Sequence, residues 1–166
     1  MARTPGDVTI TLSVLDRLLD KEPKTQLEAP LTRSQALRAM KAGVQRDLEW
    51  LLNTRRIAEE PDEALKEVNR SLFVYGLPDL LNFTVGLAAD RAKLTRHLIA
   101  TLKLFEPRLL NVRVIPIDSS EIGIQQLQFR IEGLLAVDPA PEPVSFDTFI
   151  ELKTGTCRVA GGPNAG

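Results

Sequence analysis

Apolar residues recur at intervals of three and four between residues 33 and 55, a period that predicts one long amphipathic helix. Thr32 and Gln35 have the spacing of a capping box, which satisfies free amides at the start of a helix. The apolar stripe consists of Leu37, Met40, Val44, Leu48, Leu51 and Leu52. We expect this stripe to belong to the core rather than to form a groove for a partner helix. The opposite face, which includes Arg46 and Asp47, is charged, and we expect Asp47, Arg55 and Arg56 on the exposed face and at the end of the helix.

Shorter helices are predicted on both sides of the long one. Residues 8–20 gather leucines at helical spacing, and residues 62–72 do the same over a shorter stretch. A further helix over 90–105 has Asp90 as its expected N-cap, and Pro107 stops it because the residue before a proline avoids helical geometry. The apolar side of this helix consists of Leu94, Leu98, Ile99, Leu102 and Phe105.

The second half of the chain changes to a period of two, which is typical of strands with one buried face. Residues 110–114 and 127–131 alternate apolar and polar side chains. A third run, 144–152, follows a turn-rich segment, and a short edge strand is expected at 157–159. Antiparallel pairing of these runs follows from the short connections between them.

Together these elements predict an α+β fold: a long helix over about 33–55, another over about 90–105, and a C-terminal antiparallel meander of three to four strands. The length fits one domain over 1–166. Residues 1–7 and the glycine-rich segment 160–166 are expected to be flexible tails.

Composition excludes several classes of partner. The chain has 21 basic and 22 acidic residues and a formal net charge of -1, so no overall field attracts nucleic acid or an anionic membrane. No uninterrupted apolar stretch is long enough to insert into a bilayer, and the N-terminus does not resemble a secretory signal. We therefore expect a cytoplasmic protein.

The sequence offers little for catalysis. Cys157 is the only cysteine and His97 the only histidine, so we expect no disulfide, no metal site and no cofactor, with His97 on a helix surface. No phosphate-binding loop or known catalytic motif is present, so no catalytic residue is assigned. The carboxylates Glu106, Asp118 and Glu121 leave glycosidic hydrolysis as a weak alternative, because two carboxylates at a suitable separation suffice for it.

Glu106, Pro107 and Arg108 form the most unusual polar pattern. A glutamate at the end of a helix opposes the helix dipole, and the proline directs the residues on either side of it toward one side of the chain. The pair is either a solvated surface ion pair, a clamp for a partner, or a structural brace. Only the last of these predicts a large loss of stability when one member is removed.

Four segments resemble the TssE family, the type VI secretion relatives of the small GPW baseplate wedge protein of contractile phage tails. They are SVLDRLLD at 13–20, RDLEWLLNTRR at 46–56, YGLPD at 75–79 and FEPRL at 105–109. The runs around Phe129 and Val144 are also similar to strands of that family.

The resemblance implies a structural, non-enzymatic subunit of a baseplate that is assembled at the inner membrane. Implied partners are TssF, TssG and TssK type wedge proteins and the contractile sheath, whose polymerisation it would start by strand exchange at an open edge of a sheet formed by 125–137 and 144–153. The residues implied in partner binding are Glu106, Pro107, Arg108, Arg55, Arg56 and Arg130. Some members have been labelled lysozyme-like, so a peptidoglycan hydrolase with Glu106 as general acid is the alternative.

Overall fold

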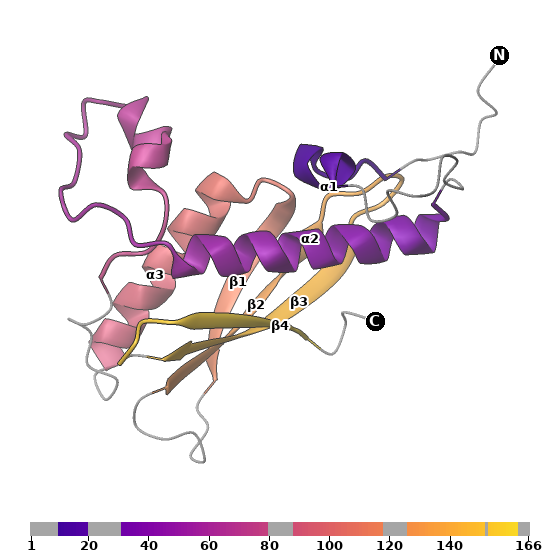
Figure 1. The fold of residues 1–166 in the computed structure, drawn as a ribbon. Helices are drawn as coiled ribbons and strands as arrows, with labels where there is room; N and C mark the ends of the chain where they lie inside the picture. The colour runs from indigo at the N-terminus through magenta and orange to yellow at the C-terminus, as the bar shows by residue number, and fades with distance from the viewer. Residues whose placement is uncertain (1–9, 20–30, 80–87, 118–125, 152, 163–166) are drawn as a thin grey trace.

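The computed structural model describes residues 10–19, 31–79, 88–117, 126–151 and 153–162. In chain order its elements are α1 (Val14–Leu18), α2 (Arg33–Asn53), the 3₁₀ turns η1 (Val68–Arg70) and η2 (Leu72–Val74), α3 (Ala88–Phe105), β1 (Leu109–Ile117), β2 (Gln126–Leu135), β3 (Glu142–Glu151) and β4 (Cys157–Gly161). The strands form one antiparallel sheet in the order β1-β2-β3-β4. The α+β fold with a C-terminal meander is therefore confirmed (Figure 1).

The long helix α2 runs across the sheet (Figure 1). Its predicted capping box is present, since the Gln35 amide donates to Thr32 Oγ1 at 3.3 Å and the Thr32 amide donates to Gln35 Oε1 at 2.9 Å. The helix ends at Asn53, before the expected residue 55, because Thr54 adopts extended geometry. Its apolar stripe is in the core, as predicted, with Leu48 and Leu52 fully buried.

The core lies between the helices and one face of the sheet, as expected for a two-layer domain. Strands β2 and β3 contribute alternate side chains to it, so the predicted period of two is confirmed there. The largest fully buried side chains are Phe129, Phe146, Leu48, Leu52, Leu77, Leu94, Leu98, Leu102, Ile131, Leu135 and Ile150. They belong to a single hydrophobic cluster that joins α2, α3 and the sheet.

The segment between α2 and α3 differs from its prediction. Instead of one short amphipathic helix it forms η1 and η2, and Leu72 is 80% exposed. Ser71 separates the two turns because its backbone is extended and its hydroxyl accepts a hydrogen bond from the Phe73 amide at 3.2 Å. Residues 57–74 project from the body as a lobe (Figure 1). The helical spacing of Leu65 and Leu72 was not sufficient to form a helix, because the lobe offers no apolar surface against which they pack, and both are exposed.

Two further expectations need correction. Helix α3 begins at Ala88, so Asp90 lies in its first turn and is not its N-cap. In β1 the buried residue is Leu109 and Leu110 is exposed, which reverses the expected alternation at the start of the strand. The reason is a register shift between Leu110 and Arg113, where Asn111 has a φ of 53°.

The C-terminal strand is longer than expected. Ala160 and Gly161 pair with β3, and the Gly162 amide donates to the Ser145 carbonyl at 3.0 Å. A Cβ at Gly162 would lie 2.3 Å from Ser145 Oγ, so this glycine permits a close approach of two segments. The flexible tail expected over 160–166 is thus wrong for 160–162, while 163–166 and the other expected tail, 1–7, lie outside the described residues.

Candidate protein-interaction site

Glu106, Pro107 and Arg108 form the corner between α3 and β1. The helix stops at Phe105, and the Leu109 amide donates to the Glu106 carbonyl at 3.0 Å, which turns the chain into the strand. Arg108 donates to both carboxylate oxygens of Glu106, from Nε to Oε1 at 2.5 Å and from Nη2 to Oε2 at 2.7 Å. The two side chains lie on one side of the corner, as predicted, and Pro107 is exposed.

The corner is not the solvated ion pair that its sequence also allowed. Glu106 is only 4% exposed, and such a charge is stable in the protein only when it is paired and hydrogen-bonded. Arg108 is half-buried over the carboxylate. The geometry therefore favours the structural brace among the alternatives, because most of the pair faces the protein and not solvent.

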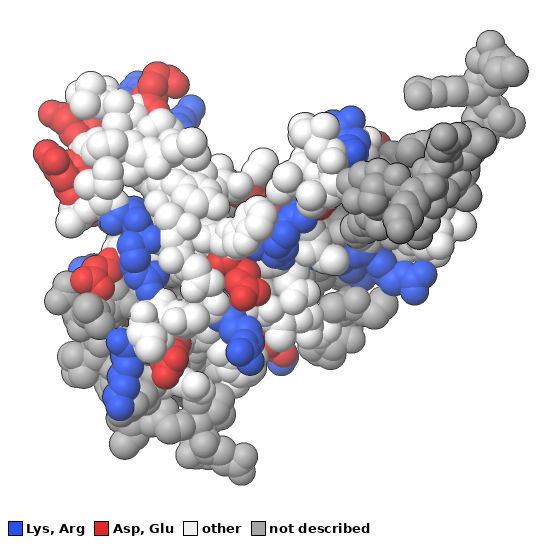
Figure 2. All heavy atoms as spheres, viewed as in Figure 1, with Lys and Arg blue, Asp and Glu red and all other residues white. Residues whose placement is uncertain are grey.

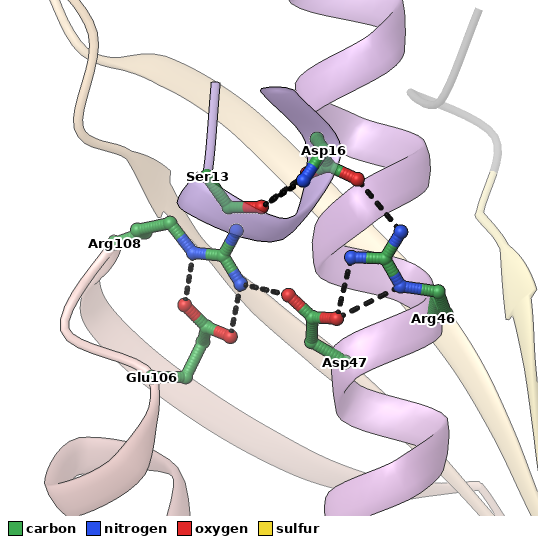
Figure 3. A network of polar contacts seen from close by, with 6 residues as sticks. All are labelled: Ser13, Asp16, Arg46, Asp47, Glu106 and Arg108. Atoms are coloured by element: carbon green, nitrogen blue, oxygen red, sulfur yellow. Dashed lines mark hydrogen bonds and ion pairs between the residues drawn. The ribbon is translucent and has the colours of Figure 1, made fainter. Parts of the chain in front are cut away.

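The brace continues into a chain of charges that links the corner to α2 and α1 (Figure 3). Arg108 Nη2 also donates to Asp47 Oδ2 at 2.7 Å. The other oxygen of Asp47 accepts from Arg46 Nε and Nη2 at 3.0 and 2.8 Å. Arg46 Nη1 then donates to Asp16 Oδ1 at 2.7 Å, and Ser13 Oγ donates to Asp16 Oδ2 at 2.6 Å. Positive and negative groups alternate, so each charge has opposite neighbours.

This polar network (Ser13, Asp16, Arg46, Asp47, Glu106 and Arg108) connects three parts of the fold: α1, α2 and the corner after α3. Helix α1 has only five residues and buries none of them. A helix of this length is not stable alone, so its position depends on tertiary contacts. The closest approach is at Gly43, where a Cβ would lie 2.7 Å from Asp16 Oδ2. The network thus holds α1 on α2 through polar contacts.

Electrostatics in the network follow from these contacts. The hydrogen bonds that Arg108 donates to Glu106 and to Asp47, against an opposing effect of burial, raise its pKa above the ordinary value. Partial burial of Asp16 acts to raise its pKa, but hydrogen bonds from Ser13 and Arg46 outweigh burial and lower the pKa. Both shifts favour the charged forms of Arg108 and Asp16.

An aromatic pair packs beside the corner. The rings of Tyr75 and Phe105 meet edge to face, with centroids 5.0 Å apart and planes at 73°. Burial, followed by the charges of Asp47 and Glu106, raises the pKa of Tyr75. On the other side of the network, Arg46 lies over the ring of Trp50 at 5.1 Å. Of the two arginines of the network, Arg46 thus has a cation–π contact in addition to its ion pairs.

Arg55 and Arg56 do not lie on α2, where they were expected at its end, but immediately after it. Arg56 pairs with Glu60 at 2.8 Å, and its amide donates to the Leu77 carbonyl at 2.9 Å. The Arg55 guanidinium contacts the carbonyl of Gly155, in the turn before β4. Arg55 is exposed for the rest of its surface. Arg55 thus connects the end of α2 to the turn before β4, and Arg56 connects it to Glu60 and Leu77. Neither arginine belongs to the network.

Arg130 lies in β2, which is an interior strand. It is paired across the sheet with Asp147 of β3, to which Nε donates at 2.8 Å. The open edges are consequently β1 and β4, and the expectation of an edge within 125–137 or 144–153 is wrong. A proline at Arg130 would therefore disrupt pairing inside the sheet and would not test an exposed edge.

The two real edges differ in how they are covered. At β4, Asn53 of α2 donates to the Cys157 carbonyl at 2.7 Å and accepts from its amide at 2.8 Å, and Gln45 donates to the Val159 carbonyl at 2.9 Å. Side chains of α2 thus occupy the outer edge of β4. At β1 no described residue hydrogen-bonds to the outer edge of Val112 to Ile117, which carries Pro116 as a protection against pairing.

The geometry of Glu106 does not fit the role of a general acid. A general acid must transfer a proton to its substrate, but both oxygens of Glu106 accept hydrogen bonds from Arg108, which is a donor only. The other carboxylates considered, Asp118 and Glu121, lie outside the described residues. Burial raises the pKa of the Cys157 thiol to about 12, which makes it a poor nucleophile. Among the described residues, no group of metal-ligating side chains is present.

The sequence predicted the corner but not its partners. Asp47 and Arg46 were assigned to an exposed, charged face of α2, because helical periodicity cannot show that a short segment thirty residues earlier packs against that face. Asp16 was not singled out either. The available signal was the resemblance itself, since segments 13–20, 46–56 and 105–109 supply every member of the network.

Comparison with known protein families gives one match. A family model described as baseplate wedge protein gp25 matches residues 38–140, which include most of α2, all of α3, the corner and the first two strands. The chain belongs to this family, whose members are structural proteins of the baseplate wedge. Searches of curated proteins and of solved structures found no match. No helix in the described residues is both long enough and apolar enough to span a membrane.

Proposed function

We propose that the chain is a structural subunit of a type VI secretion baseplate, of the TssE type, and that it has no enzymatic activity. The match to the baseplate wedge family over residues 38–140 carries this proposal. The TssE assignment within the family rests on the resemblance of segments 13–20, 46–56, 75–79 and 105–109. The protein would act in the cytoplasm, in a baseplate assembled at the inner membrane.

Its partners would be wedge proteins of the TssF, TssG and TssK type and the first ring of the contractile sheath. We propose that sheath subunits add at the outer edge of β1, because the edge of β4 is already occupied by side chains of α2. Pro116 limits how far along β1 an added strand can pair, since proline lacks an amide hydrogen. The available stretch thus runs from the bulge at Asn111 toward Pro116.

The predicted binding residues divide into three groups in this proposal. Pro107 and Arg55 are exposed and can contact a partner directly. Glu106 is buried, so it would act by holding the corner and α1 in position. Arg56, Arg108 and Arg130 are half-buried and already engaged in ion pairs, so they offer a partner only the part of the guanidinium that is left exposed.

Co-expression with TssF and TssG type proteins tests the proposal. The chain should co-elute with them as one complex, and a strain that lacks its gene should regain fluorescent sheath assembly when the gene is returned. Val114→Pro, which removes a donor from β1, should reduce sheath assembly more than wedge binding. A stable chain that neither joins the wedge proteins nor restores sheath assembly would refute it. Clearing of peptidoglycan by the purified protein would instead support hydrolysis.

A further inference from the structure

A shallow groove between the lobe and α3 is not used by the network. It lies between η1 with the residues before it and the C-terminal half of α3, and it is open to solvent, with a volume of about 690 Å³. The groove is lined by Glu63, Lys66, Asn69, Arg70, Ala100, Lys103 and Leu104. Ala100, Lys103 and Leu104 lie on the same side of α3, because Lys103 and Leu104 follow Ala100 by three and four positions.

The wall formed by the lobe is held by local hydrogen bonds. Asn69 Nδ2 donates to the Asp62 carbonyl at 2.9 Å and to the Leu65 carbonyl at 3.0 Å. Asp62 Oδ1 in turn accepts from the Ala64 amide at 2.8 Å. These bonds fix the backbone from which Lys66 projects. A wall that is formed before binding loses less entropy when a partner arrives.

Charge in the groove is unbalanced. Lys66, Arg70 and Lys103 are exposed on its lining, and none of them forms a salt bridge within the described part of the chain. Glu63 is the single carboxylate of the lining. The other carboxylates of the lobe do not line the groove, and Figure 2 shows acidic side chains along the outer edge of the lobe at the upper left. The groove therefore presents a net positive surface.

The floor of the groove is apolar. Leu104 is 37% exposed there, beside Ala100, although its position near the end of α3 would allow a polar residue. A phosphate polymer gains nothing from such a floor and would be repelled by Glu63. A peptide segment with both carboxylates and an apolar side chain matches the rim and the floor together.

We propose that this groove binds an acidic, amphipathic segment of another baseplate protein, whose carboxylates pair with Lys66, Arg70 and Lys103 while an apolar side chain packs on Leu104. This inference rests on the proposed function, because it places the partner in the baseplate. It adds a second contact surface, separate from the corner and from the edge of β1.

Photo-crosslinking tests the inference. A benzophenone amino acid replaces Ala100 in the full chain, which is co-expressed with TssF and TssG type wedge proteins, and crosslinked peptides are sequenced by mass spectrometry. We expect a wedge peptide rich in aspartate or glutamate with an apolar residue among them. Lys66→Glu combined with Lys103→Glu should reduce the crosslink by about tenfold. Arg158→Glu, an exposed reversal on β4, is the matched control and should leave the yield unchanged.

The outcomes separate this inference from the proposed function. If the wild-type chain co-elutes with the wedge proteins but the groove crosslinks to none of them, to a second copy of the chain, or to a peptide without carboxylates, the groove proposal is wrong and the function stands. If the chain does not join the wedge proteins, both are wrong. Lys66→Gln with Lys103→Gln should also lower the yield, and an unchanged thermal midpoint in this variant excludes misfolding as the cause.

Discussion

Replacing Arg108 by alanine is the most direct test of the brace. The substitution removes both donors to Glu106 and the donor to Asp47. Glu106, at 4% exposure, would then be left with its charge nearly buried and no cationic partner. Its alternatives are to take up a proton or to draw water into the corner, and both cost free energy of folding.

The expected loss is large for a single substitution. Removing one partner from a buried ion pair costs about 3 to 5 kcal/mol. The Arg108 side chain is 23% exposed, so water can replace part of the lost interaction. We therefore expect a loss of about 2 to 4 kcal/mol. For a protein of this size, that corresponds to a decrease in melting temperature of roughly 4 to 16 °C.

Urea unfolding followed by circular dichroism at pH 7 measures this loss. Arg130→Ala is the matched control, because it breaks an arginine–carboxylate pair on the outer face of the sheet, and its midpoint should be unchanged within error. Arg108→Lys should fall between the control and alanine, since lysine keeps the charge but cannot bind both oxygens of Glu106 in the same fork. A midpoint for Arg108→Ala equal to that of the control would refute the brace.

Three further substitutions and one chemical test probe other parts of the fold. Leu48→Ala should cost about 2 to 5 kcal/mol in urea unfolding, because the side chain is fully buried. The pKa of Asp16 is lowered below its ordinary value of 3.8. The stability that Asp16 contributes is therefore present above pH 3.8 and is lost as the pH falls through the lowered pKa. We expect Asp16→Asn to have less hydrogen-exchange protection of α1 than the wild type at neutral pH, and this difference should vanish in acid. Replacing glycine by alanine inside a helix usually stabilises a protein by about 1 kcal/mol, but Gly43→Ala should lack this gain because its Cβ would meet Asp16. In a thermal melt, Gly43→Ala should show the gain when it is made in an Asp16→Ala background. Cys157 should react with a thiol reagent at pH 8 only after denaturant is added, since its pKa is about 12.

Periodicity predicted the parts of the fold in which each element packs on the core with a regular pattern. In α2, β2 and β3 the apolar spacing and the burial agree, because each of these elements has one face against the same hydrophobic cluster. The prediction was wrong where local geometry departs from a regular element. Asn111 introduces a bulge that reverses the alternation at the start of β1, while Val112 and Val114 are buried as predicted, and Ser71 divides a predicted helix into two turns.

The candidate site could be predicted only in part for a different reason. The corner of Glu106 and Arg108 is local in sequence, so the helix end and the proline sufficed to place both side chains together. The contacts that bury it are distant, since Asp47 lies sixty-one positions before Arg108 and Asp16 a further thirty-one before Asp47. Burial decides whether the pair is a brace or a solvated contact, and burial depends on packing that periodicity does not describe.

The internal position of the brace changes how assembly defects at this corner should be interpreted. A defect caused by Glu106→Ala or Arg108→Ala does not show that a partner touches these side chains, because both substitutions disturb the network that continues through Asp47 and Arg46 to α1. Pro107 separates the two explanations, since it is exposed and its ring makes no hydrogen bond. If partners contact the corner directly, Pro107→Glu should impair wedge binding without lowering stability. If the corner acts only through α1, wedge binding should instead follow the exchange protection of α1 across the variants, and Pro107→Glu should bind as the wild type does.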